Sequence, residues 1–156
     1  MFSRSVAEII VSYNPFVSWF NVDKLNWHKL STNLNPNAID LLKANVDKID
    51  WGMLSLNPNA IDMLKANPDK INWYWLNINP AAVNLLKDNP DKINWAELSE
   101  NPNAIDILKD NVDKIDWFYL SQNPNAIDLL KTNPDKINWK QLSKNPNAIN
   151  LLKANV

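Results

Sequence analysis

Apolar and polar residues recur along this chain in a pattern that predicts short amphipathic helices. In residues 57–66 four apolar side chains fall within about a 160° arc of a helical wheel, namely Ala60, Ile61, Met63 and Leu64. Asp62, Lys65 and Ala66 lie on the other side. The same pattern returns at regular intervals up to residue 154. The spacing therefore predicts a series of helices that each bury one face.

The segment that follows, residues 67–78, predicts a second short helix. Trp73 and Leu76 stand at positions that hold tryptophan and leucine in all six copies of the pattern, and the wheel places them on one side. We therefore expect a row of tryptophans and leucines to form the buried seam of the array. Ile71, in the first turn, is expected to pack against the preceding helix.

Asparagine followed by proline marks the boundary between these predicted helices, because all ten prolines of the chain follow an asparagine. Asparagine is a favourable N-cap residue, and proline both holds the residue before it in an extended conformation and suits the first helical position. Each Asn-Pro pair thus predicts the start of a helix of about 9–11 residues. Helices this short are marginal alone in water, so their neighbours must stabilise them.

The period of the pattern is 22 residues, as the spacing of five tryptophans shows: Trp51, Trp73, Trp95, Trp117 and Trp139. Such a period is typical of arrays in which each unit packs mainly on its neighbours. The predicted fold class is all-α, a solenoid of tandem 22-residue repeats with two short helices in each, over residues 21–156. Residues 1–20 do not fit the repeat. We interpret them as an N-terminal capping segment, the alternative being a targeting segment.

The repeats differ mainly at the two residues directly after each tryptophan and at the residue three positions further on. On the wheel these positions form one narrow face opposite the tryptophan–leucine row, here called the variable stripe. Aromatic and apolar residues are concentrated on it: Met53, Leu56, Tyr74, Trp75, Ile78, Phe118 and Tyr119. Drift on an exposed face favours polar residues, so we predict that these seven contact a protein or peptide partner. Trp75 is the tryptophan expected to be exposed.

Two other uses of the stripe stay open. A second copy of the chain can pair with it or with the C-terminal end, where the sequence shows no capping residues, and such contacts would make a structural protein of a virion or filament. Recognition of a nucleic acid through the variable residues of the stripe is the weaker alternative. The chain has 17 acidic and 16 basic residues, and only Lys140 and Lys144 cluster on the stripe.

The composition lacks the residues on which several common kinds of enzyme site depend. His28 is the single histidine, Gly52 the single glycine, and cysteine is absent, so histidine triads, thiolate metal sites and glycine-rich phosphate loops lack their residues. We expect no catalytic residue, metal, cofactor or small-molecule substrate. No apolar run approaches the length of a membrane span, so a soluble intracellular protein is favoured.

The segment Leu-Ser-x-Asn-Pro-Asn-Ala-Ile-x-x-Leu, present at 98–108 and 120–130, resembles the short-helix solenoids of the leucine-rich-variant and HEAT-like kind. The resemblance covers residues 21–156 and implies stacked helices that begin at amide-capped proline turns. The repeat wording, as in NPNAIDMLKANPDKINW at 57–73, is similar to tandem repeats encoded by giant DNA viruses, which implies a viral protein. Neither resemblance brings catalytic residues with it.

Overall fold

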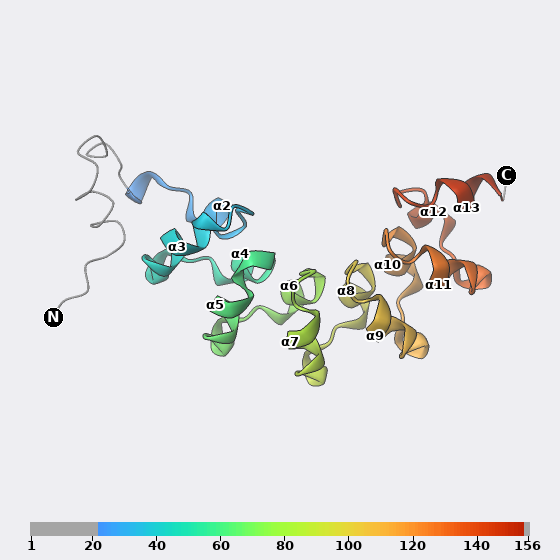
Figure 1. Ribbon diagram of the computed structural model, residues 1–156, viewed down its shortest axis with the longest axis horizontal. Helices are drawn as coiled ribbons and strands as arrows, with labels where there is room; N and C mark the ends of the chain where they lie inside the picture. The colour runs from blue at the N-terminus through green and yellow to red at the C-terminus, as the bar shows by residue number, and fades with distance from the viewer. Residues whose placement is uncertain (1–21, 155–156) are drawn as a thin grey trace. The chain divides into compact units, whose positions relative to one another are not determined.

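A computed structural model of the chain describes residues 22–154 and shows short α-helices, 3-10 helices and turns (Figure 1). The described residues contain no strand. Equivalent helices recur every 22 residues over most of the array. The predicted all-α array of tandem repeats is therefore confirmed, whereas the predicted capping segment, residues 1–20, lies outside the described residues.

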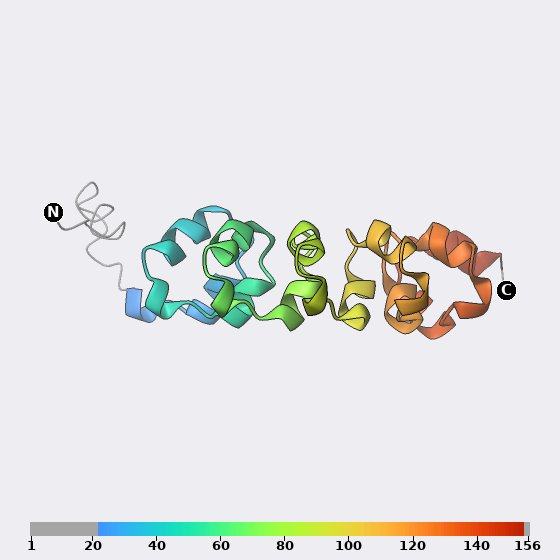
Figure 2. The ribbon, with the colours of Figure 1, turned by 90° about the horizontal axis from the view of Figure 1, so that it is seen from below.

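Each full repeat holds two α-helices and a 3-10 helix, and the repeat of residues 51–72 has one more 3-10 helix, Pro58–Ala60. Figure 2 shows these short helices joined by loops along the chain. One α-helix begins at each repeat tryptophan: α2 (Trp27–Ser31), α4 (Trp51–Ser55), α6 (Trp73–Ile78), α8 (Trp95–Glu100), α10 (Trp117–Gln122) and α12 (Trp139–Leu142). The other follows Asn-Pro: α3 (Asn37–Lys43), α5 (Ile61–Lys65), α7 (Val83–Lys87), α9 (Ile105–Lys109), α11 (Ile127–Lys131) and α13 (Ile149–Lys153). The 3-10 helices are η2 (Val22–Lys24), η3 (Val46–Lys48), η4 (Pro58–Ala60), η5 (Pro68–Lys70), η6 (Pro90–Lys92), η7 (Val112–Lys114) and η8 (Pro134–Lys136).

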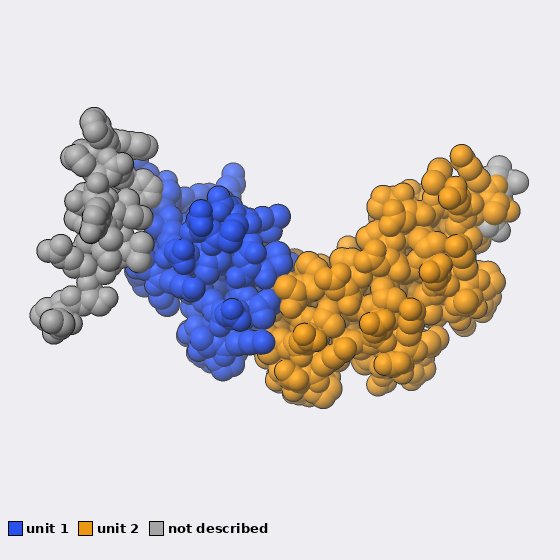
Figure 3. Space-filling view, viewed as in Figure 1, with its two compact units in different colours: residues 1–72 blue, residues 73–156 orange. Residues whose placement is uncertain are grey.

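The chain divides into two compact units, residues 1–72 and 73–156 (Figure 3). Within the second unit the tryptophan-initiated helices form one row, since α8 packs against α6 and α10, and α10 packs against α12. Figure 1 shows α7, α9 and α11 in a second row beside them. In the first unit α2 packs against α3 and α4, and α4 packs against α5.

The predicted second helix of each repeat is interrupted, which corrects the interpretation of residues 67–78. After η5 the backbone becomes extended at Ile71, with φ −66° and ψ 124°, and α6 begins only at Trp73. Asn67 makes no N-cap hydrogen bond. Its side-chain amide instead donates to the carbonyl of Met63 at 2.9 Å, so this asparagine stabilises the end of the preceding helix.

The N-cap is the asparagine or aspartate directly before each tryptophan. Asp116 accepts hydrogen bonds from the backbone N–H groups of Phe118 and Tyr119, and Asn94 accepts one from Ala96. Equivalent caps are made by Asn26, Asp50 and Asn138. Only asparagine or aspartate precedes the six repeat tryptophans, so the sequence did contain this signal for a helix start.

The core consists of leucines from both α-helices of each repeat. The leucine three residues after the tryptophan is fully buried in five copies: Leu54, Leu76, Leu98, Leu120 and Leu142. The other helix buries a second leucine in five of its six copies: Leu42, Leu64, Leu86, Leu108 and Leu130. Asp62 and Lys65 are exposed and Ile71 is buried, as predicted. The amphipathic pattern therefore located the leucine core correctly.

The tryptophans lie at the margin of this core, so the predicted burial of the tryptophan row is wrong. Five repeat tryptophans are only partly buried, and Trp139 is 42% exposed. The wheel failed because the helix is broken between Ile71 and Trp73, so that each tryptophan is the first residue of its helix. Trp75 is partly buried, which contradicts its predicted exposure. Lys114 Nζ lies 4.8 Å from the centre of the Trp95 ring, a cation–π contact.

A row of buried asparagines joins neighbouring repeats. The Asn101 side-chain amide donates to the carbonyls of Asn77 at 2.8 Å and Asn79 at 2.9 Å, and its Oδ1 accepts from the Asn103 N–H. The same three contacts, with the equivalent partners, are made by Asn57, Asn123 and Asn145. These amides satisfy buried backbone groups that the short helices leave without partners. They form the row here called the asparagine row.

Serines near the ends of the tryptophan-initiated helices make a second set of links between repeats. Ser99 Oγ donates to the Trp95 carbonyl at 2.6 Å and accepts from the Asp116 N–H at 3.1 Å. Ser121 repeats the arrangement one unit later. These hydrogen bonds at the helix ends give the serines a structural role.

Candidate binding surface

The variable stripe lies on the tryptophan-initiated helices beside their buried residues, and its three positions differ in exposure. In α6, Leu76 and Asn77 are buried, whereas Tyr74 is exposed and Trp75 and Ile78 are partly buried. The buried pair lies three and four residues after the tryptophan, and the stripe positions fall on the other side of the helix. The first stripe position is the one most often exposed, whereas the second is buried at Glu97 and Gln141, so the helical wheel predicted the exposure of the stripe only in part.

In the second unit the side-by-side packing of four helices makes the stripe a surface shared by four repeats. Its residues are Tyr74, Trp75 and Ile78 on α6; Ala96, Glu97 and Glu100 on α8; Phe118, Tyr119 and Gln122 on α10; and Lys140 and Gln141 on α12, with Lys144 just beyond it. Five of the seven predicted partner contacts therefore belong to one unit. Met53 and Leu56 belong to the first unit, on α4 and at its C-cap.

Two aromatic pairs stand on this surface, one on each side of α8. The rings of Tyr74 and Trp75 meet edge to face with centroids 4.9 Å apart, and those of Phe118 and Tyr119 do so at 5.2 Å. Tyr74 is 48% exposed and Phe118 is 45% exposed. Edge-to-face contact is a favoured arrangement of aromatic rings, so each pair holds its exposed ring in place.

Two carboxylates from α8 lie between the aromatic pairs. Glu97 is only 6% exposed, and its hydrogen bond with the Tyr74 hydroxyl, together with its charge, raises the pKa of Tyr74. Tyr119 and Glu100 also raise the pKa of Tyr74 through weaker electrostatic effects, so groups from α6, α8 and α10 converge here. Burial, followed by the charge of Glu97, raises the pKa of Glu100, while Lys144 acts in the opposite direction.

The junction between α10 and α12 has equivalent positions, but the hydroxyl group is missing there. Two repeats further on, Phe118 occupies the position of Tyr74, and Gln141 occupies that of Glu97. Gln141 is 4% exposed, and its Oε1 has no hydrogen-bond partner among the described residues. Phe118 has no hydroxyl to donate, which accounts for the unsatisfied oxygen if the side chains meet as Tyr74 and Glu97 do.

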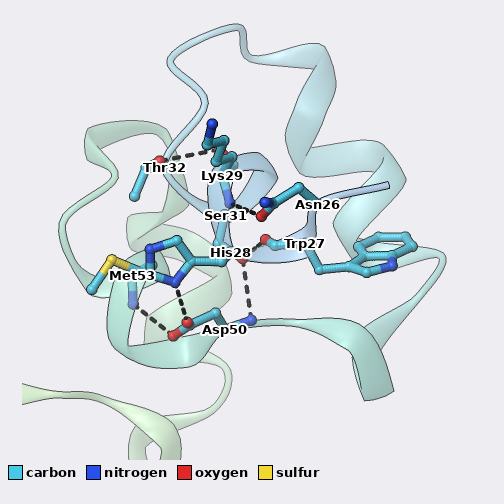
Figure 4. Close-up of polar contacts among 8 residues, drawn as sticks. All are labelled: Asn26, Trp27, His28, Lys29, Ser31, Thr32, Asp50 and Met53. Atoms are coloured by element: carbon cyan, nitrogen blue, oxygen red, sulfur yellow. Dashed lines mark hydrogen bonds and ion pairs between the residues drawn. The ribbon is translucent and has the colours of Figure 1, made fainter. Parts of the chain in front are cut away.

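In the first unit, His28 lies on the stripe and is held by the following repeat (Figure 4). Its Nδ1 lies 2.8 Å from Asp50 Oδ2, and Asp50 also accepts a hydrogen bond from the Met53 N–H at 3.0 Å. That backbone hydrogen bond is the main cause of the lowered pKa of Asp50. His28 therefore takes part in a surface contact between repeats.

Glu97, Glu100 and Gln141 were missed by the sequence interpretation, which selected only aromatic and apolar residues of the stripe. All three stand at stripe positions, so the pattern did mark where they lie. Their contacts depend on which residues of adjacent repeats meet. That register comes from the packing of α6, α8, α10 and α12 and is not encoded in any single repeat.

No family model, curated protein or solved structure matches this chain. Among the described residues, no helix has the length and apolar character needed to cross a membrane. The same part of the chain brings together no group of three or more histidine, aspartate or glutamate side chains that could hold a metal ion.

Proposed function

We propose that this protein is a non-enzymatic repeat scaffold that binds a protein or peptide partner through the variable stripe of its second unit. The observation that carries the proposal is the pair of nearly half-exposed rings, Tyr74 on α6 and Phe118 on α10, which flank α8 on that stripe. Exposed aromatic groups of this kind are enriched among the residues that dominate binding energy at protein interfaces.

The fold itself does not require these rings. At the position of Tyr74 and Phe118, α8 carries Ala96, yet α8 buries its leucine and serine just as α10 does. The helices α6, α8 and α10 therefore act as an internal control, since each buries a leucine and a small polar residue while the residue after its tryptophan changes. A role outside the fold, such as contact with a partner, explains the aromatic choice.

The helices that carry the stripe are also joined to one another by packing and hydrogen bonds. Each tryptophan-initiated helix of the second unit is tied to its neighbours by leucine packing, and the asparagine row and the serines add hydrogen bonds between repeats. A surface that is already ordered before binding loses less conformational entropy when the partner arrives. This arrangement favours binding of a flexible peptide to a preformed surface over a process in which the scaffold itself folds on binding.

Selection from a displayed library of random peptides tests the proposal directly. Peptides of about 12 residues span up to about 40 Å when extended, long enough to cross several helices. We expect the full chain to enrich a set of related sequences, and the double variant Tyr74→Ala/Phe118→Ala to lose their binding while its thermal stability stays close to that of the wild type.

The matched control is Val46→Ala/Val112→Ala, which truncates two exposed apolar residues that lie outside the stripe. This variant should bind the selected peptides as the wild type does. Selected peptides that bind Tyr74→Ala/Phe118→Ala normally, or a library that yields no related sequences, would contradict the proposal.

Self-assembly is the second candidate, and the charges of the stripe favour it specifically. Glu97 and Glu100 stand on α8, whereas Lys140 and Lys144 stand on or beside α12, so two antiparallel copies can pair opposite charges. Light scattering over a range of concentrations separates the candidates. A molar mass that rises in the wild type and stays monomeric in Tyr74→Ala/Trp75→Ala supports self-assembly, and a monomer throughout excludes it.

A further inference from the structure

We infer that the segment bound by the variable stripe carries an arginine, placed over Ala96 between the two aromatic pairs and beside the carboxylates of Glu97 and Glu100. This inference rests on the proposed function and specifies the chemistry of the partner. It follows from three features of α8 and its neighbours: the size of the side chains, the charge of the surface, and the geometry that a guanidinium needs.

At the first stripe position, α8 carries a much smaller side chain than its two neighbours. Ala96 stands between Tyr74 on α6 and Phe118 on α10 at equivalent positions of three consecutive repeats. Both flanking aromatic residues are exposed, Tyr74 by 48% and Phe118 by 45%, and each is far larger than Ala96. A side chain that enters over Ala96 therefore meets an aromatic ring on each side.

Charge identifies what kind of side chain can enter. Glu97 and Glu100 place two carboxylates at α8, and the Tyr74 hydroxyl that Glu97 accepts from carries no positive charge. Lys144 is the cation that lowers the pKa of Glu100, and it lies two residues after the end of α12. The surface at α8 is thus acidic between its aromatic walls, and a cation complements it whereas a carboxylate would be repelled.

Geometry favours arginine over lysine. A guanidinium is planar, stacks on aromatic rings and donates paired hydrogen bonds to carboxylates, while an ammonium offers a single strongly hydrated charge. Aromatic rings on two sides with carboxylates between them match the binding requirements of a guanidinium. Toward α12 the stripe turns basic with Lys140 and Lys144, so an acidic residue of the segment belongs at that end.

The test starts from the peptides selected on the full chain. We expect arginine to be enriched at one position of the related sequences. A fluorescein-labelled copy of the strongest binder is then titrated by fluorescence anisotropy against the wild type and against Glu97→Gln/Glu100→Gln. Replacing the peptide arginine by glutamine should weaken binding to the wild type by about tenfold or more, and replacing it by lysine should weaken binding less.

On Glu97→Gln/Glu100→Gln the same arginine-to-glutamine change should have little effect, because its charged partners are gone. Asp106→Asn/Asp128→Asn, which removes two exposed carboxylates from α9 and α11 in the other row, should leave the arginine preference intact. Thermal melting confirms that each variant is folded. Glu100→Gln alone preserves the Glu97–Tyr74 hydrogen bond and should show part of the effect.

Peptides that bind through Tyr74 and Phe118 but lack arginine would overturn this inference and leave the proposed function in place. An arginine effect of equal size on Glu97→Gln/Glu100→Gln would overturn it as well. Absence of selected peptides, with a molar mass that rises with concentration, would show that a second copy occupies the stripe and would overturn both the inference and the peptide-binding function.

Discussion

The asparagine row and the variable stripe run through the same repeats of the second unit, yet one is nearly constant and the other changes at each step. Asn101 and Asn123 each satisfy two carbonyls of the preceding repeat and one N–H of their own. The stripe positions Ala96 and Phe118, in contrast, differ completely without disturbing the helix that carries them. The constant row is fixed by backbone groups, which are the same in every repeat.

This difference explains why the array is built from asparagine as much as from leucine. Helices of four to seven residues leave most of their terminal N–H and C=O groups outside the helical hydrogen-bond pattern. A buried amide has a donor and an acceptor side and can serve both kinds of group at once. The stripe side chains are not needed to pair buried backbone groups, so they can vary and can be selected for contact with a partner.

The largest expected effect comes from breaking the asparagine row. Asn101→Ala removes three hydrogen bonds and leaves buried backbone groups without partners, each of which costs about 1–3 kcal/mol. We expect a loss of about 3–5 kcal/mol in the free energy of unfolding, measured by chemical denaturation.

The control for Asn101→Ala is Asn103→Ala, two residues further on. Asn103 also donates to a carbonyl of the preceding repeat, that of Pro80 at 2.9 Å, but this contact is exposed. Its removal should cost about 1 kcal/mol or less. Equal losses for the two variants would show that burial of the amide is not what makes the row constant.

The tryptophans, which are constant but only partly buried, should give an intermediate effect. Trp95→Ala removes a partly buried ring and its contact with Lys114, and we expect a loss of about 2–3 kcal/mol, below the range for a fully buried tryptophan. Ala96→Gln, on the stripe next to it, should be close to neutral. Thermal and chemical denaturation of both variants compare a constant position with a variable one on the same helix.

The sequence predicted the repeat, the all-α class and the leucine core, because each depends on spacing within one repeat. The stripe predicted to be exposed holds the buried Glu97 and Gln141. The sequence interpretation misplaced the start of the helix at Asn67, since Asn-Pro resembles an N-cap wherever it occurs, and the break at Ile71 then shifted Trp73 out of the core. The contacts of Glu97 with Tyr74 depend on the register between repeats, which no single repeat specifies. The asparagine row escaped prediction for the same reason.

Gln141 is a stripe residue with a buried side chain, and its Oε1 has no hydrogen-bond partner among the described residues. Gln141→Met keeps a long unbranched side chain and removes the polar atom, so we expect a gain of about 1 kcal/mol in stability. Phe118→Tyr should give a smaller gain by supplying a donor, as Tyr74 does for Glu97.

Gln122→Met serves as the control for Gln141→Met, because Gln122 is a partly buried stripe residue of α10. Its replacement should leave the denaturation midpoint within about 0.5 kcal/mol of the wild type. A gain of the same size at both positions would point to a general benefit of methionine on the stripe and away from the unsatisfied oxygen of Gln141.

Glu100 should give the smallest effect, and its pH dependence sets it apart. Burial and the charge of Glu97 raise its pKa, so the folded state holds the proton more tightly than the unfolded state does, and the charged form is disfavoured at neutral pH. Glu100→Gln should therefore stabilise the protein at pH 7 by a few tenths of a kcal/mol, roughly, because Glu100 remains partly exposed to solvent. As the pH falls through the raised pKa and below the ordinary value of 4.5, Glu100 becomes neutral in both states and the advantage should vanish. Thermal denaturation of wild type and variant across this pH range measures the difference, and a gain that persists in acid would show that charge at α8 does not oppose folding.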